Sequence, residues 1–176
     1  MTMEILLLGV VGAAIGLIVL STLRTGASPL PTSASVRATM LAVLPDRVGG
    51  PIYELGSGWG GLARSLARRY PSVSVRGFEV SVLPWAVSRA VLAAAGPANL
   101  SLACKNFHAA DLSDAALVVC YLPGPAMEKL RPKLEAELPP GALILSNTFA
   151  LRGWQAVDTR TAPDMYRSRV YLYRVE

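Results

Sequence analysis

The stretch YELGSGWGG, residues 53–61, combines a glycine-rich turn with a carboxylate at its start. Gly56, Gly58 and Gly61 have the spacing of the G-x-G-x-x-G fingerprint, in which glycine backbone approaches the phosphates of a dinucleotide. Glu54 lies two residues before Gly56. A pyrophosphate prefers backbone N–H groups without a nearby carboxylate, because like charges about 4 Å apart repel by several kcal/mol at an effective dielectric of about 20. The turn therefore favours a cationic ligand over a diphosphate.

A second carboxylate, Glu79, ends the next apolar run, VSVRGFEV at residues 73–80. In sheets built from alternating strands and helices, an acid at this point binds the hydroxyls of an adenosine ribose. NAD enzymes carry such an acid too, so Glu79 indicates an adenosine cofactor of either kind. S-adenosyl-L-methionine adds an ammonium and a sulfonium group to adenosine, and it is the cofactor that both carboxylates together favour. An NAD(P) cofactor stays open as the alternative.

Short apolar runs alternate with helical patterns along most of the 176 residues, which leave room for one domain. We expect strands at 51–55, 73–80, 100–105, 116–122 and 141–149, and helices at 33–44, 61–70, 84–95 and 124–138. Runs at 154–159 and 168–176 have no helix between them and should pair antiparallel. The predicted α/β fold is a Rossmann-like, mostly parallel sheet with helices on both faces and a C-terminal antiparallel hairpin, preceded by one N-terminal transmembrane helix.

The segment from Ile5 to Leu23 has no charged residue and approaches the roughly 20 apolar residues that cross a bilayer. A signal peptide would have Lys or Arg before this run, and none is present. The run also has several glycines and no polar face, which argues against a buried core helix. Arg24 and Arg37 follow the segment, so the positive-inside rule places the remainder in the cytoplasm. We expect a membrane anchor at 1–24, a linker at 25–31 and a domain at 32–176, in a single-pass protein of the cell inner membrane.

Composition argues against several other kinds of site. The formal net charge is +5, but the Arg residues are scattered and form no basic stripe interleaved with aromatic residues, so no nucleic-acid partner is expected. Cys104 and Cys120 lack metal-ligand spacing and are predicted to be small core residues. His108 is the only histidine, which supports neither a multi-histidine metal site nor a Ser-His-Asp triad. No metal is expected.

Several motifs resemble known families. The run E-L-G-S-G-W-G at 54–60, Glu79 and the terminal hairpin are similar to the class I, seven-strand S-adenosylmethionine-dependent methyltransferases. The PTSxxV pattern at 31–36, the run ADLSDAALVVCYL at 110–122 and the short C-terminal ending resemble more closely the membrane-anchored protein-lysine methyltransferases. That family includes the enzymes of the mitochondrial ATP-synthase c-subunit and adenine nucleotide translocase type and their prokaryotic relatives.

This resemblance implies a set of cofactor-binding residues along the strand ends: Glu54, Gly56, Gly58, Gly60, Glu79, Asn106 and Phe107. By this resemblance Glu54 holds the amino group of the methionine part of the cofactor, the backbone of the three glycines runs alongside that part, and Glu79 binds the ribose. Asn106 stands where many members place an Asp that contacts the adenine amino group, with Phe107 beside the ring. Asn in place of Asp keeps a hydrogen-bond acceptor for the adenine amino group but loses the negative charge. Tyr121 is the implied catalytic residue, because it would face the reacting methyl group.

The expected activity is protein-lysine N-methylation by a membrane-anchored enzyme, with a protein substrate, possibly a membrane protein. An apolar entrance would lower the pKa of the acceptor lysine, and Tyr121, Phe149 and Trp154 follow strand ends where such an entrance would lie. A methyltransferase for a lipid or small amine, an NAD(P)-binding oxidoreductase and a catalytically silent binding module stay open. The fourth strand is followed by CYLPGP rather than Asp/Asn-Pro-Pro-Tyr/Phe, which disfavours methylation of exocyclic amines of nucleobases or of glutamine.

Overall fold

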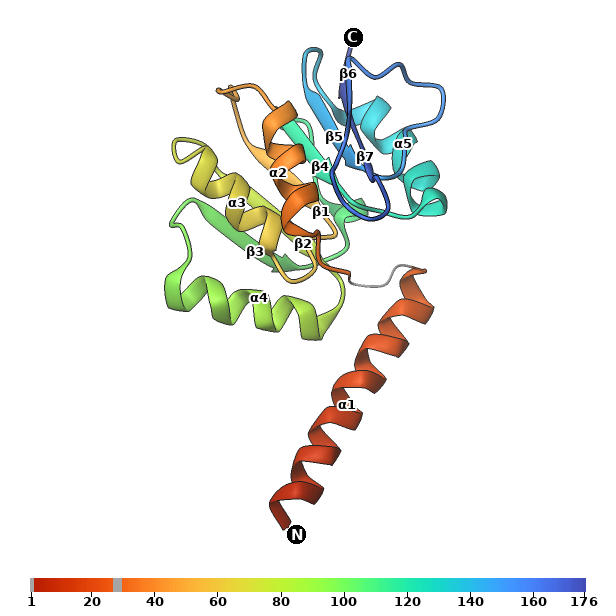
Figure 1. The fold of residues 1–176 in the computed structure, drawn as a ribbon. Coiled ribbons are helices and arrows are strands. Elements are labelled where there is room, and N and C mark those ends of the chain that lie inside the picture. Colours follow the sequence, from red (N-terminus) through yellow and green to blue (C-terminus); the bar gives the residue numbers. More distant parts are fainter. Residues whose placement is uncertain (1, 27–29) are drawn as a thin grey trace.

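A central β-sheet organises the chain in a computed structural model that describes residues 2–26 and 30–176. The strand order in the described part is β3-β2-β1-β4-β5-β7-β6. Strands β1 to β5 pair in parallel, and β7 runs antiparallel to both β5 and β6. The strands are β1 (Ile52–Leu55), β2 (Val75–Glu79), β3 (Leu100–Cys104), β4 (Leu117–Cys120), β5 (Leu143–Asn147), β6 (Asp158–Thr161) and β7 (Arg169–Arg174). This confirms the predicted parallel sheet and its C-terminal hairpin (Figure 1).

Helices cover both faces of the sheet, as predicted. They are α2 (Ala34–Val43), α3 (Gly61–Arg69), α4 (Val82–Ala95) and α5 (Gly124–Glu137). Met40 of α2 and Leu66 of α3 belong to one buried cluster, against which Trp85 of α4 packs. Leu130 and Leu134 of α5 belong to a second cluster. Strand residues alternate between the two clusters, with Ile52 in the first and Tyr53 in the second, because successive side chains of a strand point to opposite faces.

Two sequence predictions are wrong in detail. The sixth strand was expected at 154–159 but spans Asp158–Thr161. Trp154 instead packs edge-on against Tyr173, with ring centroids 6.3 Å apart, and its Nε1 donates to Glu135 Oε1 at 3.1 Å. Cys104 is exposed rather than part of the core, since it is the last residue of the edge strand β3, whereas Cys120 is buried as expected.

The N-terminal helix α1 (Thr2–Thr25) projects from the domain (Figure 1). Its span Thr2–Leu23 has a mean hydropathy of 2.6 and is 0% buried, so its length and composition suffice to cross a membrane and it is not a core helix. The helix continues one residue beyond the predicted anchor at 1–24. Of the predicted linker at 25–31, residues 27–29 lie outside the described residues.

Tyr173 ties the hairpin strand β7 to the loop between β5 and β6: it is 1% exposed and accepts a hydrogen bond from the backbone N–H of Leu151 at 3.0 Å. Tyr173→Phe leaves this buried N–H without its partner, so the free energy of unfolding should fall by about 1–3 kcal/mol. Urea unfolding measures the change. Tyr166→Phe is the control, because Tyr166 is 82% exposed, and equal stability of the two variants would contradict this role.

Candidate cofactor site

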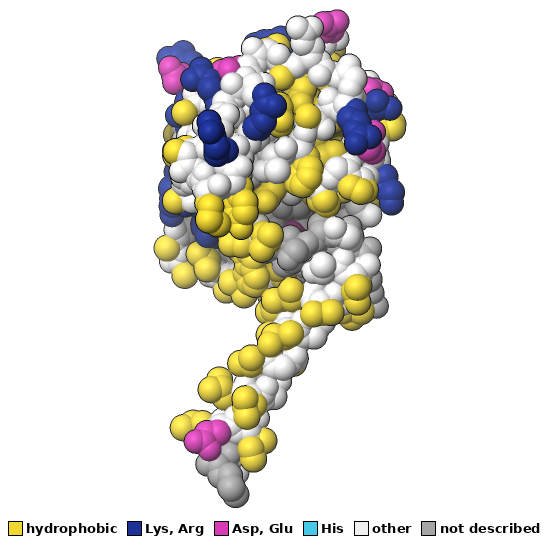
Figure 2. Space-filling model, turned by 45° about the vertical axis from the view of Figure 1, so that its right-hand side comes forward, with side chains coloured by type: hydrophobic (Ala, Val, Ile, Leu, Met, Phe, Trp, Pro, Cys, Tyr) yellow, Lys and Arg dark blue, Asp and Glu magenta, His cyan; other side chains and the backbone are white. Residues whose placement is uncertain are grey.

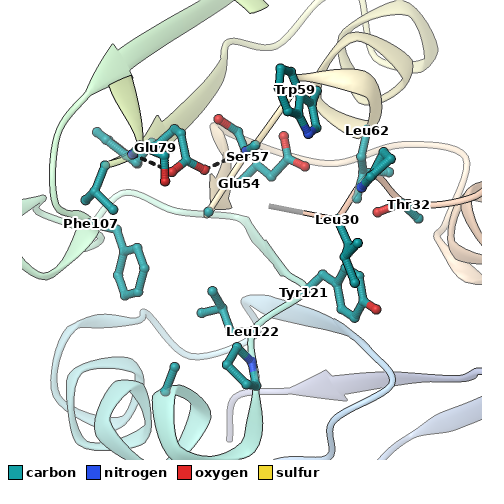
Figure 3. A pocket seen from close by; sticks show the side chains of 18 of the residues that line it. Leu30, Thr32, Glu54, Ser57, Trp59, Leu62, Glu79, Phe107, Tyr121 and Leu122 are labelled. Atoms are coloured by element: carbon teal, nitrogen blue, oxygen red, sulfur yellow. Dashed lines mark hydrogen bonds between the residues drawn. The ribbon is translucent and has the colours of Figure 1, made fainter. Parts of the chain in front are cut away.

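A cavity of about 910 Å³ lies at the C-terminal ends of the parallel strands. Its walls include the loops that follow all five of these strands, together with the residues that lead into α2. Figure 3 shows Glu54 and Glu79 on one wall, Phe107 at one side, and Tyr121 on the opposite wall. Ligands of open α/β sheets bind in this crevice, since helix N-termini and strand-end side chains converge there.

The predicted site residues come together in this cavity, with one exception. Those that line it are Glu54, Gly56, Gly58, Glu79, Asn106, Phe107 and Tyr121. Gly60 does not line it, and Gly61 does. Gly60 is instead the residue before α3, where a Cβ would lie 3.0 Å from the Ser88 Cβ.

The glycine turn after β1 follows the pattern G-x-G-x-G. Gly56, Gly58 and Gly60 have φ values of 77°, 50° and 71°, in the left-handed region that favours glycine. Gly61 is the first residue of α3, and its φ is not positive. At Gly56 a Cβ would also lie 3.0 Å from the Leu122 Cδ2, so the turn packs closely against the end of β4. The turn therefore matches the G-x-G-x-x-G fingerprint in the spacing of its glycines, but its third glycine with a positive φ is Gly60 and not Gly61.

Glu54 is a buried carboxyl with an unused oxygen. The side chain is 5% exposed, and Oε2 has no hydrogen-bond partner among the described residues. The pKa of Glu54 is raised to about 8, mainly by burial and also by the charge of Glu79, although a backbone hydrogen bond from Ala63 and the charge of Arg64 lower it. An unpaired buried carboxylate is costly unless a cation or a donor reaches it. A ligand ammonium in the cavity fits this requirement.

Glu79 holds the glycine turn against the end of β2. It is 7% exposed, its Oε2 accepts from the Gly58 N–H at 2.7 Å, and its Oε1 accepts from the Ser81 N–H at 2.7 Å (Figure 3). An ionised carboxylate has about four acceptor positions, so these two bonds leave capacity on both oxygens. The remaining positions suit a pair of ribose hydroxyls.

Asn106 begins a short 3-10 helix, Phe107–Ala109, that the sequence analysis did not anticipate. The Asn106 Oδ1 accepts from the His108 N–H at 3.0 Å, so the acceptor expected to contact adenine already has a partner. An amide oxygen has a second lone pair, and the amide nitrogen keeps two donors. Phe107 is half-buried and stacks at a tilt on His108, with ring centroids 4.6 Å apart.

Two aromatic residues form the wall opposite the glycine turn. The rings of Tyr121 and Phe149 stack with centroids 6.5 Å apart and an interplanar angle of 25°. Both are half-buried and line the cavity. Trp154, the third aromatic residue expected at this entrance, does not line the cavity, because it packs against Tyr173.

Three basic residues of the cavity were not identified from the sequence: Arg37, Arg64 and Lys129. Arg64 Nη1 donates to the Trp59 carbonyl at 3.2 Å, and Arg37 Nη1 lies 3.2 Å from the point where a Cβ on Gly61 would be. They lie near the N-terminus of α3, a region that favours anions. Arg37 and Arg64 sit within helical patterns whose spacing does not distinguish them from ordinary surface residues.

The cavity fits S-adenosylmethionine on these observations. An unpartnered oxygen of the buried Glu54 carboxyl suits the ammonium, glycines without side chains allow backbone approach, and a second carboxylate suits the ribose. A basic region at the start of α3 suits the methionine carboxylate. The diphosphate of a dinucleotide would instead lie beside Glu54.

Comparison with known proteins identifies the family. The family model described as the ANTKMT methyltransferase domain matches residues 54–158. A protein-lysine N-methyltransferase of Saccharolobus islandicus (strain REY15A) is 30% identical over 146 residues, which cover 82% of this chain and 91% of that protein. The adenine nucleotide translocase lysine N-methyltransferase of Mus musculus is 32% identical over 128 residues, 71% of this chain. The match covers 54% of the mouse protein, about half its length.

Solved structures agree with this assignment. An RNA methyltransferase from Salinibacter ruber in complex with S-adenosyl-L-homocysteine is 28% identical, with a TM-score of 0.74, and the match covers 83% of this chain and 94% of that chain. A precorrin-6y C5,15-methyltransferase from Geobacter metallireducens shares the fold at 16% identity and a TM-score of 0.64, over 84% and 92% of the two chains. The resemblance read from the sequence is thus confirmed: the chain belongs to the ANTKMT methyltransferase domain family and is an S-adenosylmethionine-dependent methyltransferase.

Proposed function

We propose that this enzyme is a protein-lysine N-methyltransferase that α1 holds on a membrane. The observation that carries the proposal is the match to the Saccharolobus protein-lysine N-methyltransferase over 91% of that protein. The length, composition and exposure of α1 support the membrane attachment. Positive charges follow the apolar part of α1 in the sequence, which favours a cytoplasmic domain.

In this proposal each cofactor-binding residue has a physical task. Glu54 accepts from the ammonium of the methionine part, Glu79 accepts from the ribose hydroxyls, and Arg37 with the start of α3 faces the methionine carboxylate. The glycine turn leaves room for this part because Gly56 and Gly58 line the cavity without side chains and have positive φ values. Phe107 lies beside the adenine. The bound cofactor supplies a methyl group on a positively charged sulfur, so the reaction needs an aligned acceptor with a free lone pair.

Tyr121 and Phe149 would receive the acceptor lysine. A lysine amine has an ordinary pKa of about 10.4 and must lose its proton before it can attack. An apolar aromatic surface disfavours the charged ammonium and so lowers that pKa. Lys129 and the arginines of the cavity act in the same direction, because a positive neighbour disfavours a second positive charge. Tyr121 is the residue we assign to orient the neutral amine.

The substrate class is tested by labelling. The full chain is incubated with radiolabelled S-adenosylmethionine and with separated protein, lipid and RNA fractions, each with and without excess S-adenosylhomocysteine as a competitor. We expect label in protein, recovered as methyl-lysine after hydrolysis. Label confined to lipid would favour the lipid or small-amine alternative. Label confined to RNA, the substrate class named for the Salinibacter neighbour, would also contradict the proposal.

The affinity for S-adenosylhomocysteine should fall as the pH is lowered below about 8. In the ligand-free protein the pKa of Glu54 is about 8, above its ordinary value of 4.5, so below pH 8 the carboxyl must release a proton before it pairs with the ammonium. The loss approaches tenfold per pH unit. Calorimetric titration from pH 6 to 8 measures it, and Glu54→Gln should remove the dependence. A constant affinity over this range would contradict the coupling of ammonium binding to ionisation of Glu54.

The separate roles of Glu54 and Glu79 can be tested with a fragment of the ligand. Methylthioadenosine has the ribose but lacks the amino acid part, so Glu54→Gln should weaken S-adenosylhomocysteine while leaving methylthioadenosine almost unchanged. The matched variant Glu79→Gln should weaken both ligands. Hydrogen bonds to charged groups contribute about 1.5–3 kcal/mol, so each loss should be at least about tenfold in Kd. If both variants weaken both ligands equally, the assignment of separate roles is wrong.

A further inference from the structure

The outer face of α4 is unusually apolar for a surface helix. Its sequence VLPWAVSRAVLAAA has one charged residue, Arg89. Val82, Val87 and Val91 are 60%, 40% and 43% exposed, and the other exposed residues of the helix besides Arg89 are alanines. A helix that covers one side of a sheet normally turns polar residues to water. Exposed contiguous apolar surface is typical of a binding or membrane-contact site.

The neighbouring helix α3 provides a comparison within the same layer. Its exposed residues are Arg68 and Arg69, and its half-buried positions include Arg64 and Ser65. Both helices pack on the sheet through the same cluster, with Leu66 of α3 in its core and Trp85 of α4 against it. The apolar outer face is therefore a property of α4 and not of the layer. We call the exposed Val82, Val87 and Val91, with the alanines among them, the α4 outer face.

The α4 outer face lies beside the helix that is able to cross a membrane. The hydroxyl groups of Ser21 in α1 and Ser81, the residue before α4, form a hydrogen bond. Ser21 lies four residues before the end of α1 at Thr25, or about 6 Å along the helix axis. When α1 crosses a bilayer, the start of α4 is thereby held close to the depth of the headgroups.

The distribution of side chains on the domain agrees with this placement. In Figure 2 hydrophobic side chains gather on the part of the domain next to α1, and most Lys and Arg side chains on that face lie farther from α1. Val80, between β2 and α4, is 41% exposed and extends the apolar surface toward the cavity that it also lines. The apolar surface thus runs from α1 to the wall of the cofactor site.

We propose that the α4 outer face lies in the boundary between lipid headgroups and acyl chains of the membrane that α1 crosses. This inference rests on the proposed membrane attachment by α1 and adds a second contact. With α1 as the only membrane contact the domain can still tilt relative to the bilayer, whereas a second contact fixes its orientation. Because Val80 and Ser81 join α4 to the cavity wall, this contact holds the cavity at the membrane surface.

Depth measurements on the full chain test the proposal. The exposed Cys104 is changed to Ser, and the buried Cys120 stays in place because the label does not reach it. One exposed cysteine, Val87→Cys or Val91→Cys, then carries an environment-sensitive fluorophore. Ser72→Cys is the control, because Ser72 is exposed and lies between α3 and β2, at the edge of the sheet opposite the cavity. In vesicles of phosphatidylcholine and phosphatidylglycerol, we expect blue-shifted emission and strong quenching by spin-labelled lipid at 87 and 91 but not at 72.

Three results would overturn the proposal. Quenching at 87 and 91 that is as weak as quenching at 72 means that α4 lies in water. A blue shift without quenching by lipid means that protein, such as a second copy of the chain, covers the face. Failure of the full chain to bind vesicles removes the anchoring by α1 as well. Only this last result also contradicts the membrane part of the proposed function, so the two failures are distinguishable.

A charge substitution supplies a functional readout. Val87→Glu with Val91→Glu should keep the affinity for S-adenosylhomocysteine, which reports an intact cofactor site, and should keep vesicle binding through α1. Labelling of proteins in the membrane fraction should fall at least about tenfold (about 1.4 kcal/mol). The matched control is Ser72→Glu with Ser74→Glu, both exposed between α3 and β2 at the edge of the sheet opposite the cavity, which should label normally. Equal labelling by the two double variants would overturn the proposal.

Discussion

The carboxyl of Glu54 is the group on which the chemistry of the site depends. It lies on β1, the strand between β2 and β4, where all four residues are buried. In the register Glu54 is opposite Gly77 on one side and Val119 on the other, so two ladders of hydrogen bonds hold its backbone in place. The sheet therefore keeps an acid in a position where water cannot solvate it fully. That position is useful only when a cation binds.

The buried Glu54 carboxyl lowers the stability of the ligand-free protein and favours the binding of a cationic ligand. The folded-state pKa of Glu54, about 8, lies above its ordinary value of 4.5. Between these pH values the folded protein holds more protons than the unfolded chain, so the ligand-free protein loses stability as the pH rises through this window. A cationic ligand reverses the effect by pairing with the carboxylate. Glu79 complements it differently, since both of its oxygens already bind backbone N–H groups and hold the glycine turn.

The sequence was sufficient to predict the architecture and most of the residues that meet in the cavity. Strand-to-helix alternation predicts the parallel sheet, and parallel strands bring their C-terminal ends to one edge, so Glu54, Glu79 and Tyr121 could be placed together. The positions of Trp154 and Arg37 depend on tertiary contacts. Trp154 looks like a strand residue but packs on Tyr173, and Arg37 reaches the cavity only because α2 folds beside α3. No local pattern reports such contacts.

A crystal structure of the full chain with S-adenosylhomocysteine tests the central claim most directly. The quantity to measure is the distance between the Glu54 carboxylate oxygens and the amino group of the ligand. The account predicts a hydrogen bond between them, made directly or through one ordered water, with the adenosine ribose at Glu79. A ligand bound with its amino group elsewhere, or a Glu54 carboxyl turned away from the ligand, would contradict it.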